Sequence, residues 1–544
     1  MESDFYALVE KRQSCRDYDA TREVEEAKIQ RILEAGRLAP SACNSQPWHL
    51  IAVTQPQLLN EMADALASMG MNRWASQARA FIVIVQEQPN FTARLGGWIK
   101  NKHFPLIDCG IVASHITLAA TQEGLGGSIR YALGAHSFAW LVPHHEYRDT
   151  HPEYFSFYNG RRQNVENDHW QLCLTNPDLV DIVVKNAREI LKANPDKKIL
   201  SISQNDNPYN CQCENCLKSD AEEGSPVGTL IKFVNRVAEI LEPEFPDVMF
   251  DILAYHYTRP ASRKTQTRHN VCVRLCASST CFAHPYDKCD DRSRAVKHPN
   301  GKTTVFIDDL IEWSKVCNRL YVWDYTSNFP LYPMPFANWR VLQPNLQTMA
   351  KHNVKGVFEE ANCAANGGVD FNELRTYLLC KLMWNPDCDI DAYRKEFMEY
   401  YYGEAAPHLD KYLNMLCDFV EKENYHLYIQ DIKRPDYLSE ELLITYNDLF
   451  DKAEKAVAGD GIRLSRVQKA RLSIRFVDIF WNEILSGNYN AQKINQFFTD
   501  LRAHNISRLD EWSNIERTYR AWMEGKERGV YLSTPWRYDR ESIL

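Results

Sequence analysis

The sequence has no long apolar run, no cluster of basic residues and no signal-like beginning. No apolar stretch approaches the roughly 20 residues that a membrane-spanning helix needs. The formal net charge is −9 and there is no Lys/Arg-rich run, so we expect neither nucleic acid nor a membrane as a partner. The start, Met1-Glu-Ser-Asp-Phe-Tyr6, lacks the basic and apolar parts of a secretory signal, and we therefore expect a cytoplasmic protein.

The chain has 544 residues, which is too many for one ordinary core and predicts roughly two to four domains. Its composition, with 44% apolar and 25% charged residues, is typical of globular proteins. The pattern of the sequence changes at the glycine-rich stretch from Glu123 to His136 and again after Pro386. We therefore expect a multidomain protein of mixed α/β and α+β class, with domains at residues 1–129, 130–386 and 387–544.

The first part combines strand-like runs, such as Trp48–Val53 and Phe81–Val85, with helical patterns, which indicates an α+β segment. Arg12-Gln-Ser-Cys-Arg16 places two guanidinium groups and a hydroxyl close together, a combination that suits a phosphate. The loop Pro40–Trp48 carries amides that could contact the edge of a heterocycle. The alternative is that the arginines form surface ion pairs and that the loop is an ordinary connection.

Three motifs follow one another in this part: Lys11-Arg-Gln-Ser-Cys-Arg-Asp-Tyr18, Leu38–Trp48 and Gly124-Leu-Gly126. Their order and separation resemble the FMN-dependent nitroreductase family. The resemblance implies a homodimer, FMN at the subunit interface and NAD(P)H as the reductant. It also assigns the cofactor-binding side chains, which are Arg12, Gln13, Ser14, Arg16, Ser41, Asn44 and Gln46.

The resemblance further implies that the backbone of Gly126–Ile129 lies against the flavin ring. It ends at about Ile129, before the later basic residue with which family members return to the FMN phosphate. We therefore expect any FMN to be held weakly.

From about residue 130 the sequence alternates apolar strand-like runs with helical patterns, which predicts a parallel sheet and favours a TIM-like barrel. The predicted strands are Leu133–Leu141, Ile199–Ser203, Val248–Tyr255, Val271–Leu275, Leu320–Tyr325 and Val354–Glu360. These are six strands where such a barrel has eight, so the first strands would be missing. After residue 386 the helical patterns dominate and predict a C-terminal helical bundle.

Polar residues gather just past the predicted strands, where barrel enzymes place their chemistry. The candidate catalytic carboxylates are Asp206, Asp324, Glu359 and Glu360. The candidate substrate-binding residues are His136, Asn205, Tyr255 and Trp323. Paired carboxyl groups with aromatic faces are what the hydrolysis of a glycosidic bond requires, so we expect a glycan or small-molecule substrate.

Each of these residues also has a structural interpretation. Asn205-Asp206-Asn207 could be only a turn, and Asp324 could be a buried partner for another side chain. Neighbouring residues of a strand point to opposite faces, so one of Glu359 and Glu360 should point away from the site.

The sequence of this part resembles the domain of unknown function 4838 family, which is similar to TIM-barrel glycosidases. The resemblance rests on Leu133-Gly-Ala-His136, His151-Pro-Glu-Tyr-Phe155, Leu172-Cys-Leu-Thr-Asn-Pro177, Ser203-Gln-Asn-Asp206, Cys211-Gln-Cys-Glu-Asn-Cys216, Trp323-Asp-Tyr325, Lys355-Gly-Val-Phe-Glu359 and Leu382-Met-Trp-Asn-Pro386. The family has no settled activity that could be assigned to this chain, so the roles of these residues are inferred from their chemistry alone.

Cys211, Cys213 and Cys216 lie within six residues, which is denser than free core cysteines require. They could hold a structural zinc ion with a fourth ligand such as Cys173, Cys276 or Cys281. A disulfide is the alternative.

Three hypotheses about function remain open at this stage. The chain is a glycoside-hydrolase-like barrel with a nitroreductase-like passenger, an FMN-dependent NAD(P)H oxidoreductase, or a truncated fusion without catalysis.

Overall fold

The computed structural model of the chain describes residues 8–9, 12, 18, 23–66, 73–87, 90, 92, 104–123, 125, 131–162, 170–195, 197–298, 301–362 and 368–525. The chain divides into two compact units, Met1–Arg130 and Tyr131–Leu544. Within the described ranges, no helix combines the length and the hydropathy that crossing a membrane requires.

The first unit is an α+β segment, as predicted. Its antiparallel pair of strands consists of β1 (Trp48–Val53) and β2 (Phe81–Gln86). The helices are α2 (Glu26–Arg37), α3 (Pro56–Leu66) and α5 (Phe104–Gln122), with short 3-10 turns η1 (Ala42–Asn44) and η3 (Arg73–Gln77). The apolar face of α2 packs on α5 and on β1, so that Ile32, Trp48, Val112 and Ile116 form a small core.

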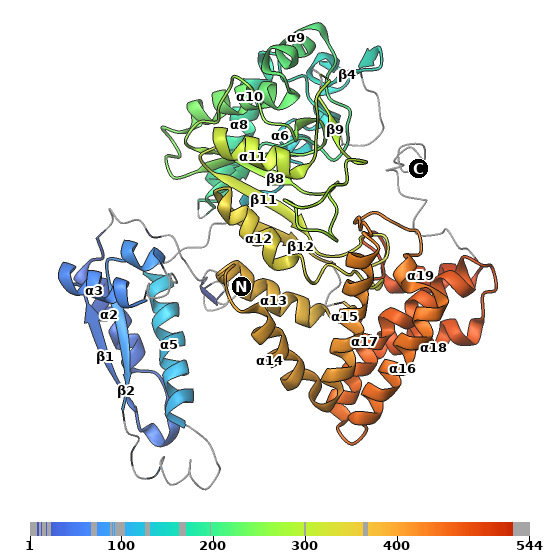
Figure 1. The fold of residues 1–544 in the computed structure, drawn as a ribbon. Coiled ribbons are helices and arrows are strands. Elements are labelled where there is room, and N and C mark those ends of the chain that lie inside the picture. The colour runs from blue at the N-terminus through green and yellow to red at the C-terminus, as the bar shows by residue number, and fades with distance from the viewer. Residues whose placement is uncertain are drawn as a thin grey trace. The chain divides into compact units, whose positions relative to one another are not determined.

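The second unit is built on a six-stranded parallel sheet (Figure 1). Its strands are β3 (Tyr131–Leu133), β6 (Ile199–Ser201), β7 (Met249–Ala254), β8 (Val271–Cys276), β11 (Leu320–Tyr325) and β12 (Val354–Glu360). They lie side by side in the order in which they occur along the chain. The helices between them are α6 (Phe138–Leu141), α7 (His144–Tyr147), α8 (Asp178–Ala193), α9 (Glu214–Glu223), α10 (Pro226–Leu241), α11 (Phe306–Val316) and α12 (Leu342–Lys351).

The closed TIM-like barrel is not confirmed. Within the described residues, β3 pairs only with β6 and β12 pairs only with β11, so the sheet stays open and corresponds to half of a barrel. The predicted strand Leu133–Leu141 is also wrong beyond Leu133. His136 has a positive φ of 58°, and the apolar residues that follow it form helix α6. A short apolar run fits a buried helix as well as a strand.

The alternation of side chains gives the sheet two different faces. On the helix-covered face, apolar residues such as Leu200, Ile252, Val273 and Val322 are fully buried. Helices α8, α10 and α12 pack against the sheet (Figure 1). We call the other face the polar face; it carries Ser201, Asp251, Arg274, Trp323 and Glu360, as the strand register requires.

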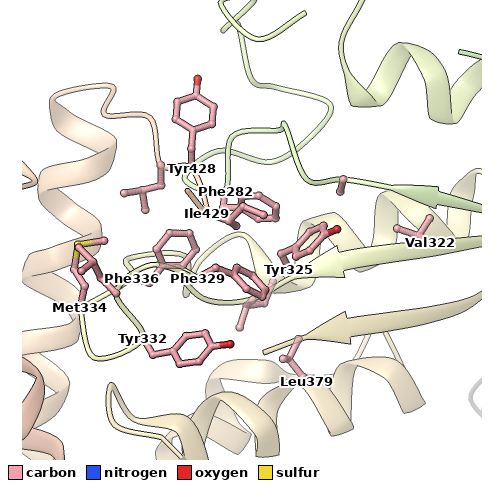
Figure 2. Packing of buried hydrophobic residues seen from close by; sticks show 14 of the residues in the cluster. Phe282, Val322, Tyr325, Phe329, Tyr332, Met334, Phe336, Leu379, Tyr428 and Ile429 are labelled. Carbon is pink, nitrogen blue, oxygen red and sulfur yellow. The ribbon is translucent and has the colours of Figure 1, made fainter. Parts of the chain in front are cut away.

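The rest of the second unit is helical, as predicted. It contains α13 (Asn372–Trp384), α14 (Ile390–Tyr402), α15 (Ala406–Lys422), α16 (Glu440–Ala456), α17 (Gly461–Ile479), α18 (Ala491–Ala503) and α19 (Ile515–Met523). Helices α13 and α19 were not predicted. Figure 2 shows the aromatic core in which this helical region meets the sheet, with the rings of Phe282, Tyr325, Phe329 and Phe336 close together.

Candidate functional site

An ion pair lies at the middle of the polar face. Arg274 donates to Asp251 Oδ2 at 2.5 Å and also to the Tyr131 hydroxyl. The Arg274 side chain is 10% exposed and that of Asp251 is fully buried. The guanidinium carbon of Arg274 lies 5.4 Å from the centre of the Trp323 ring. The pair fixes the position of this aromatic ring beside the ends of the strands.

Asp206 follows β6 and is surrounded by hydrogen-bond donors. The Tyr255 hydroxyl donates to Asp206 Oδ1 at 3.0 Å, and His256 Nε2 lies 3.7 Å from the same oxygen. Burial alone would raise the pKa of Asp206, but the nearby His256 and His136 and the hydrogen bond from the Tyr255 hydroxyl lower it overall. Asp206 is therefore an ionised carboxylate, and its side chain is 46% exposed.

His136 is held in place by backbone contacts around the end of β6. Its backbone N–H donates to Ser203 Oγ at 3.0 Å, and its Nδ1 lies 2.9 Å from the carbonyl oxygen of Gln204. Because a carbonyl oxygen can only accept, Nδ1 carries a proton, and Nε2 is left for another partner.

Glu360 ends β12 on the same face as Trp323. The indole Nε1 of Trp323 donates to Glu360 Oε2 at 2.7 Å. Burial raises the pKa of Glu360 and the charge of Asp206 raises it further, while the indole hydrogen bond only partly offsets the two. The half-exposed ring of Phe358 lies edge-on to Trp323, with ring centres 4.9 Å apart. Two aromatic rings thus border the carboxylate.

A third carboxylate, Glu511, comes from the helical region and was not predicted. Its backbone N–H donates to the carbonyl oxygen of Phe329 at 3.2 Å, in the connection that follows β11. Burial and the charges of Glu360, Asp206 and Asp510 raise the pKa of Glu511 to about 7. Glu511 lies in a loop with no motif around it, so only its distant partners along the chain could have identified it.

The other two candidate carboxylates lie on the helix-covered face. Asp324 and Glu359 are opposite each other on β11 and β12. Asp324 is buried and accepts hydrogen bonds from the Tyr286 hydroxyl at 2.5 Å and from the Tyr325 backbone N–H at 2.9 Å. Burial raises the pKa of Asp324 to about 6, and burial together with Asp324 raises that of Glu359.

The cavity between Asp324 and Glu359 is small. It has a volume of about 10 Å³ and is also lined by Asn338 and Asn345. A cavity of this size holds at most one water molecule, because one water needs about 10–15 Å³. A sugar ring therefore has no room there.

The sheet thus separates the four carboxylates that sequence analysis selected into two pairs. Asp206 and Glu360 influence each other across the polar face, while Asp324 and Glu359 do so under the helices. Asn205 is buried, and its amide donates to the carbonyl oxygen of Trp170 at 2.6 Å, so its side chain holds the fold. The remaining selected residues, His136, Tyr255 and Trp323, lie with the first pair.

In the first unit, the loop before β1 is held by its own side chains. Ser41 Oγ accepts from the backbone N–H of Gln46 at 2.8 Å, and the Gln46 amide donates to the carbonyl oxygen of Arg37 at 2.9 Å. Cys43, Asn44 and Gln46 all have positive φ values. Asn44 is exposed, and Arg12 is half-buried. The predicted ligands Gln13, Ser14 and Arg16 and the stretch 126–129 lie outside the described residues.

Four cysteines meet beside the small hairpin of β4 (Phe157–Tyr158) and β5 (Arg161–Arg162). The sulfur atoms of Cys173, Cys211, Cys213 and Cys216 all lie within 4.8 Å of one another. Cys173 Sγ is 3.6 Å from that of Cys213 and 3.9 Å from that of Cys216. Cys173 is thus the partner of the three clustered cysteines, and Cys276 and Cys281 lie elsewhere in the fold.

Comparison with known proteins gives two family matches, which overlap around the boundary between the two units. The model of the nitroreductase family matches residues 9–139. A putative NADH dehydrogenase/NAD(P)H nitroreductase of Archaeoglobus fulgidus is 31% identical over 119 residues, which are 22% of this chain and 62% of the relative. An oxygen-insensitive NADPH nitroreductase of Helicobacter pylori is 38% identical over 94 residues, 17% of this chain and 44% of the relative. The chain thus spans only about half the length of these curated relatives.

Solved structures of two proteins are also similar to this segment in sequence. A putative NADH dehydrogenase/NAD(P)H nitroreductase of Bacteroides thetaiotaomicron has 30% sequence identity, covers 23% of this chain and 66% of its own, and has a TM-score of 0.19. A nitroreductase with bound FMN from Desulfitobacterium hafniense has 27% identity, covers 23% of this chain and 68% of its own, and has a TM-score of 0.18.

The larger match begins in the first unit and extends through most of the second. The model described as Domain of unknown function (DUF4838) matches residues 82–414. Because this range is more than half of the chain, the chain belongs to the DUF4838 family.

Proposed function

We propose that residues 131–525 bind a carbohydrate and hydrolyse a glycosidic bond on the polar face of the sheet. The observation that carries this proposal is that Asp206, which follows β6, and Glu360, which ends β12, both lie at the carboxyl ends of the parallel strands, where their surroundings lower the pKa of Asp206 and raise that of Glu360. Two carboxyl groups whose surroundings separate their pKa values can act as an ionised base or nucleophile and a protonated acid.

The reaction assigns a role to each residue of this site. Glu360 donates its proton to the leaving glycosidic oxygen, while Asp206 attacks the anomeric carbon or activates water. The rings of Trp323 and Phe358 offer apolar faces on which a sugar can stack. His256 and Tyr255 keep Asp206 ionised through the contacts described above. The pair Asp324 and Glu359 is not assigned a catalytic role, because its cavity is too small for a sugar.

The test is hydrolysis of a panel of aryl glycosides and soluble polysaccharides by the full chain. Glu360→Gln should reduce kcat by about 10²–10⁴-fold, because a positioned acid contributes about that much. Glu359→Gln is the matched control, since it changes the adjacent residue on the opposite face, and it should keep activity. Loss of activity in Glu359→Gln but not in Glu360→Gln would contradict the assignment.

A second candidate function concerns the first unit, where we propose weak FMN binding and NAD(P)H-dependent reduction by a homodimer. The nitroreductase match over residues 9–139 supports it, as does the polar loop with exposed Asn44. The fit is partial, because Ser41 and Gln46 already hold the loop through hydrogen bonds. Arg12 would contact the FMN phosphate. When bound, FMN would accept a hydride.

Flavin absorption measured after incubation with excess FMN and gel filtration tests this proposal. The wild-type chain should retain FMN, and Arg16→Ala should retain less, because a guanidinium group is a strong phosphate ligand. Arg37→Ala, which changes an exposed arginine paired with Glu34, is the control. A wild-type chain without bound flavin under these conditions would overturn the proposal.

We also propose that Cys173, Cys211, Cys213 and Cys216 hold a structural zinc ion. Tetrahedral Zn²⁺–thiolate bonds of about 2.3 Å place the sulfur atoms about 3.8 Å apart, close to the separations of 3.6 and 3.9 Å found here. The backbone N–H of Phe157 donates to Cys211 Sγ at 3.3 Å and can stabilise a thiolate. Metal analysis of Cys213→Ser beside Cys380→Ser, an exposed free cysteine, tests this site.

A further inference from the structure

A second cluster of cysteine and histidine lies where the sheet meets the helical region. Cys281, His284 and Cys289 belong to the long connection that follows β8, and His426 belongs to the segment that follows α15. Their ligand atoms all lie within 4.8 Å of one another. Cys281 is buried, and the other three are half-buried.

The separations within the cluster agree with those of a tetrahedral metal site. Cys281 Sγ lies 3.5 Å from His284 Nδ1 and 3.3 Å from His426 Nδ1. Cys289 Sγ lies 3.9 Å from His426 Nδ1. Ligands at the usual zinc distances, about 2.3 Å for sulfur and about 2.0–2.1 Å for nitrogen, would have sulfur and nitrogen about 3.5 Å apart.

We propose that Cys281, His284, Cys289 and His426 bind Zn²⁺ as a closed structural site. Two thiolates and two imidazoles fill all four tetrahedral positions, and a site without an open position serves structure instead of catalysis. The site is distinct from the four-cysteine cluster and from the carboxylates of the polar face, so it does not depend on the proposed function.

Neighbouring groups support both kinds of ligand. The carboxylate of Asp290 lies 3.8 Å from Nε2 of His426, on the side of the ring that faces away from the cluster. Such a carboxylate beyond a histidine ligand orients the ring and increases its basicity. The backbone N–H of Ala283 donates to Cys281 Sγ at 3.3 Å, which stabilises a thiolate at that position.

The ion would join two segments that are far apart in the sequence. The backbone N–H of Phe282, beside one ligand, donates to the carbonyl oxygen of Leu427, beside another, at 2.8 Å. Arg294 pairs with Asp431 at 2.7 Å and lies 3.7 Å from the ring centre of Tyr428. Metal binding here would therefore fix the segment that follows α15 on the connection that follows β8.

Without a metal, the same residues have two other states. Cys281 and Cys289 could form a disulfide, although both are free thiols in the structure. Alternatively, the thiols and imidazoles could form only hydrogen bonds. The experiment has to separate these states from zinc binding.

The full chain is stripped with a chelator under reducing conditions, supplied with Zn²⁺ alone and analysed for bound metal after gel filtration. Cys289→Ser should bind one Zn²⁺ less per chain than the wild type. Cys388→Ser replaces another half-buried free cysteine outside the cluster and should bind as much as the wild type. Equal metal content in the wild type and Cys289→Ser would overturn the proposal.

A second measurement uses only the wild type and does not depend on the folding of a variant. Cysteine alkylation followed by peptide mass spectrometry measures the extent of alkylation of Cys281 and Cys289 separately from that of the four-cysteine cluster. Zn²⁺ should protect both residues from alkylation, and the chelator should abolish that protection. Equal alkylation with and without Zn²⁺, or a disulfide between Cys281 and Cys289, would overturn the proposal.

Discussion

The indole of Trp323 donates its one hydrogen bond to the carboxylate of Glu360, at 2.7 Å. The residue that offers the largest aromatic face beside the candidate site is therefore also the residue whose hydrogen bond lowers the pKa of the candidate acid. A ligand that moves the ring would change that protonation, so binding and acidity are linked through one contact.

Replacing Trp323 with Phe should separate these two roles. The phenyl ring keeps an apolar face but has no N–H, and the hydrogen bond that lowers the pKa of Glu360 is lost. The pKa of Glu360 should therefore rise, and the alkaline limit of hydrolysis should move to higher pH. The measurement is the pH profile of kcat; Trp384→Phe, a half-exposed tryptophan of α13, is the control. An unchanged profile would show that the indole does not act on the acid.

Glu511 should contribute a titration close to neutral pH. Burial and neighbouring carboxylates raise the pKa of Glu511 to about 7, so its charge appears between about pH 6 and 8. In Glu511→Gln the inflection near pH 7 should disappear from the pH profile of glycan binding or hydrolysis. Glu516→Gln, an exposed residue of α19 paired with Arg502, should keep it. If both variants retain the inflection, Glu511 does not act on the site.

Breaking the ion pair between Arg274 and Asp251 should lower the stability of the fold. In Asp251→Asn, the Arg274 guanidinium, whose side chain is 10% exposed, would lose its charged partner. The free energy of unfolding should fall by about 3–5 kcal/mol, because a buried charge is left uncompensated. Denaturant unfolding measures this. Asp247→Asn removes an exposed pair with Lys198 and should cost about 0–1 kcal/mol. Equal losses in the two variants would contradict the proposed importance of burial.

Asp324 should make the fold less stable as the pH rises. Burial raises its pKa to about 6, against about 3.9 in an unfolded chain. Between about pH 4 and 6 the unfolded chain releases this proton while the folded chain keeps it, so the free energy of unfolding falls, by roughly 3 kcal/mol in total. Asp324→Asn keeps an acceptor for Tyr286 and should remove this fall.

Denaturant unfolding at pH 4 and pH 7 measures the effect of Asp324→Asn. Asp149→Asn, at a side chain that is 85% exposed, is the control and should leave the pH dependence unchanged. If the free energy of unfolding depends on pH in the same way in the wild type and in Asp324→Asn, protonation of Asp324 does not contribute to stability.

Sequence patterns located the sheet well, because most of its strands are rich in apolar residues. Leu320–Tyr325 and Val354–Glu360 were predicted with the bounds that the structure shows. The run after Leu133 was wrong because the positive φ of His136 depends on contacts with Ser203 and Gln204, which lie in another part of the chain. Short-range periodicity carries no information about such contacts.

The sequence was sufficient to identify candidate catalytic carboxylates, but not to predict which of them lie on the same face of the sheet. Period-two alternation predicted that one of Glu359 and Glu360 points away, and the register of β11 and β12 shows which face each occupies. Neither Glu511 nor His426 could be selected, because each is brought to the sheet by the helical region. Their roles arise from packing between distant segments.

The order of the strands has a consequence for synthesis on the ribosome. Because β3, β6, β7, β8, β11 and β12 are neighbours in chain order, each strand can join an edge that has already emerged, with no wait for later sequence. Domains commonly fold in this direction during translation. Glu511 and His426 emerge later, so a nascent chain would carry the strands of the sheet before it carries these two residues. Translational pausing or truncation within the helical region would therefore leave a sheet whose shared core with the helices is incomplete.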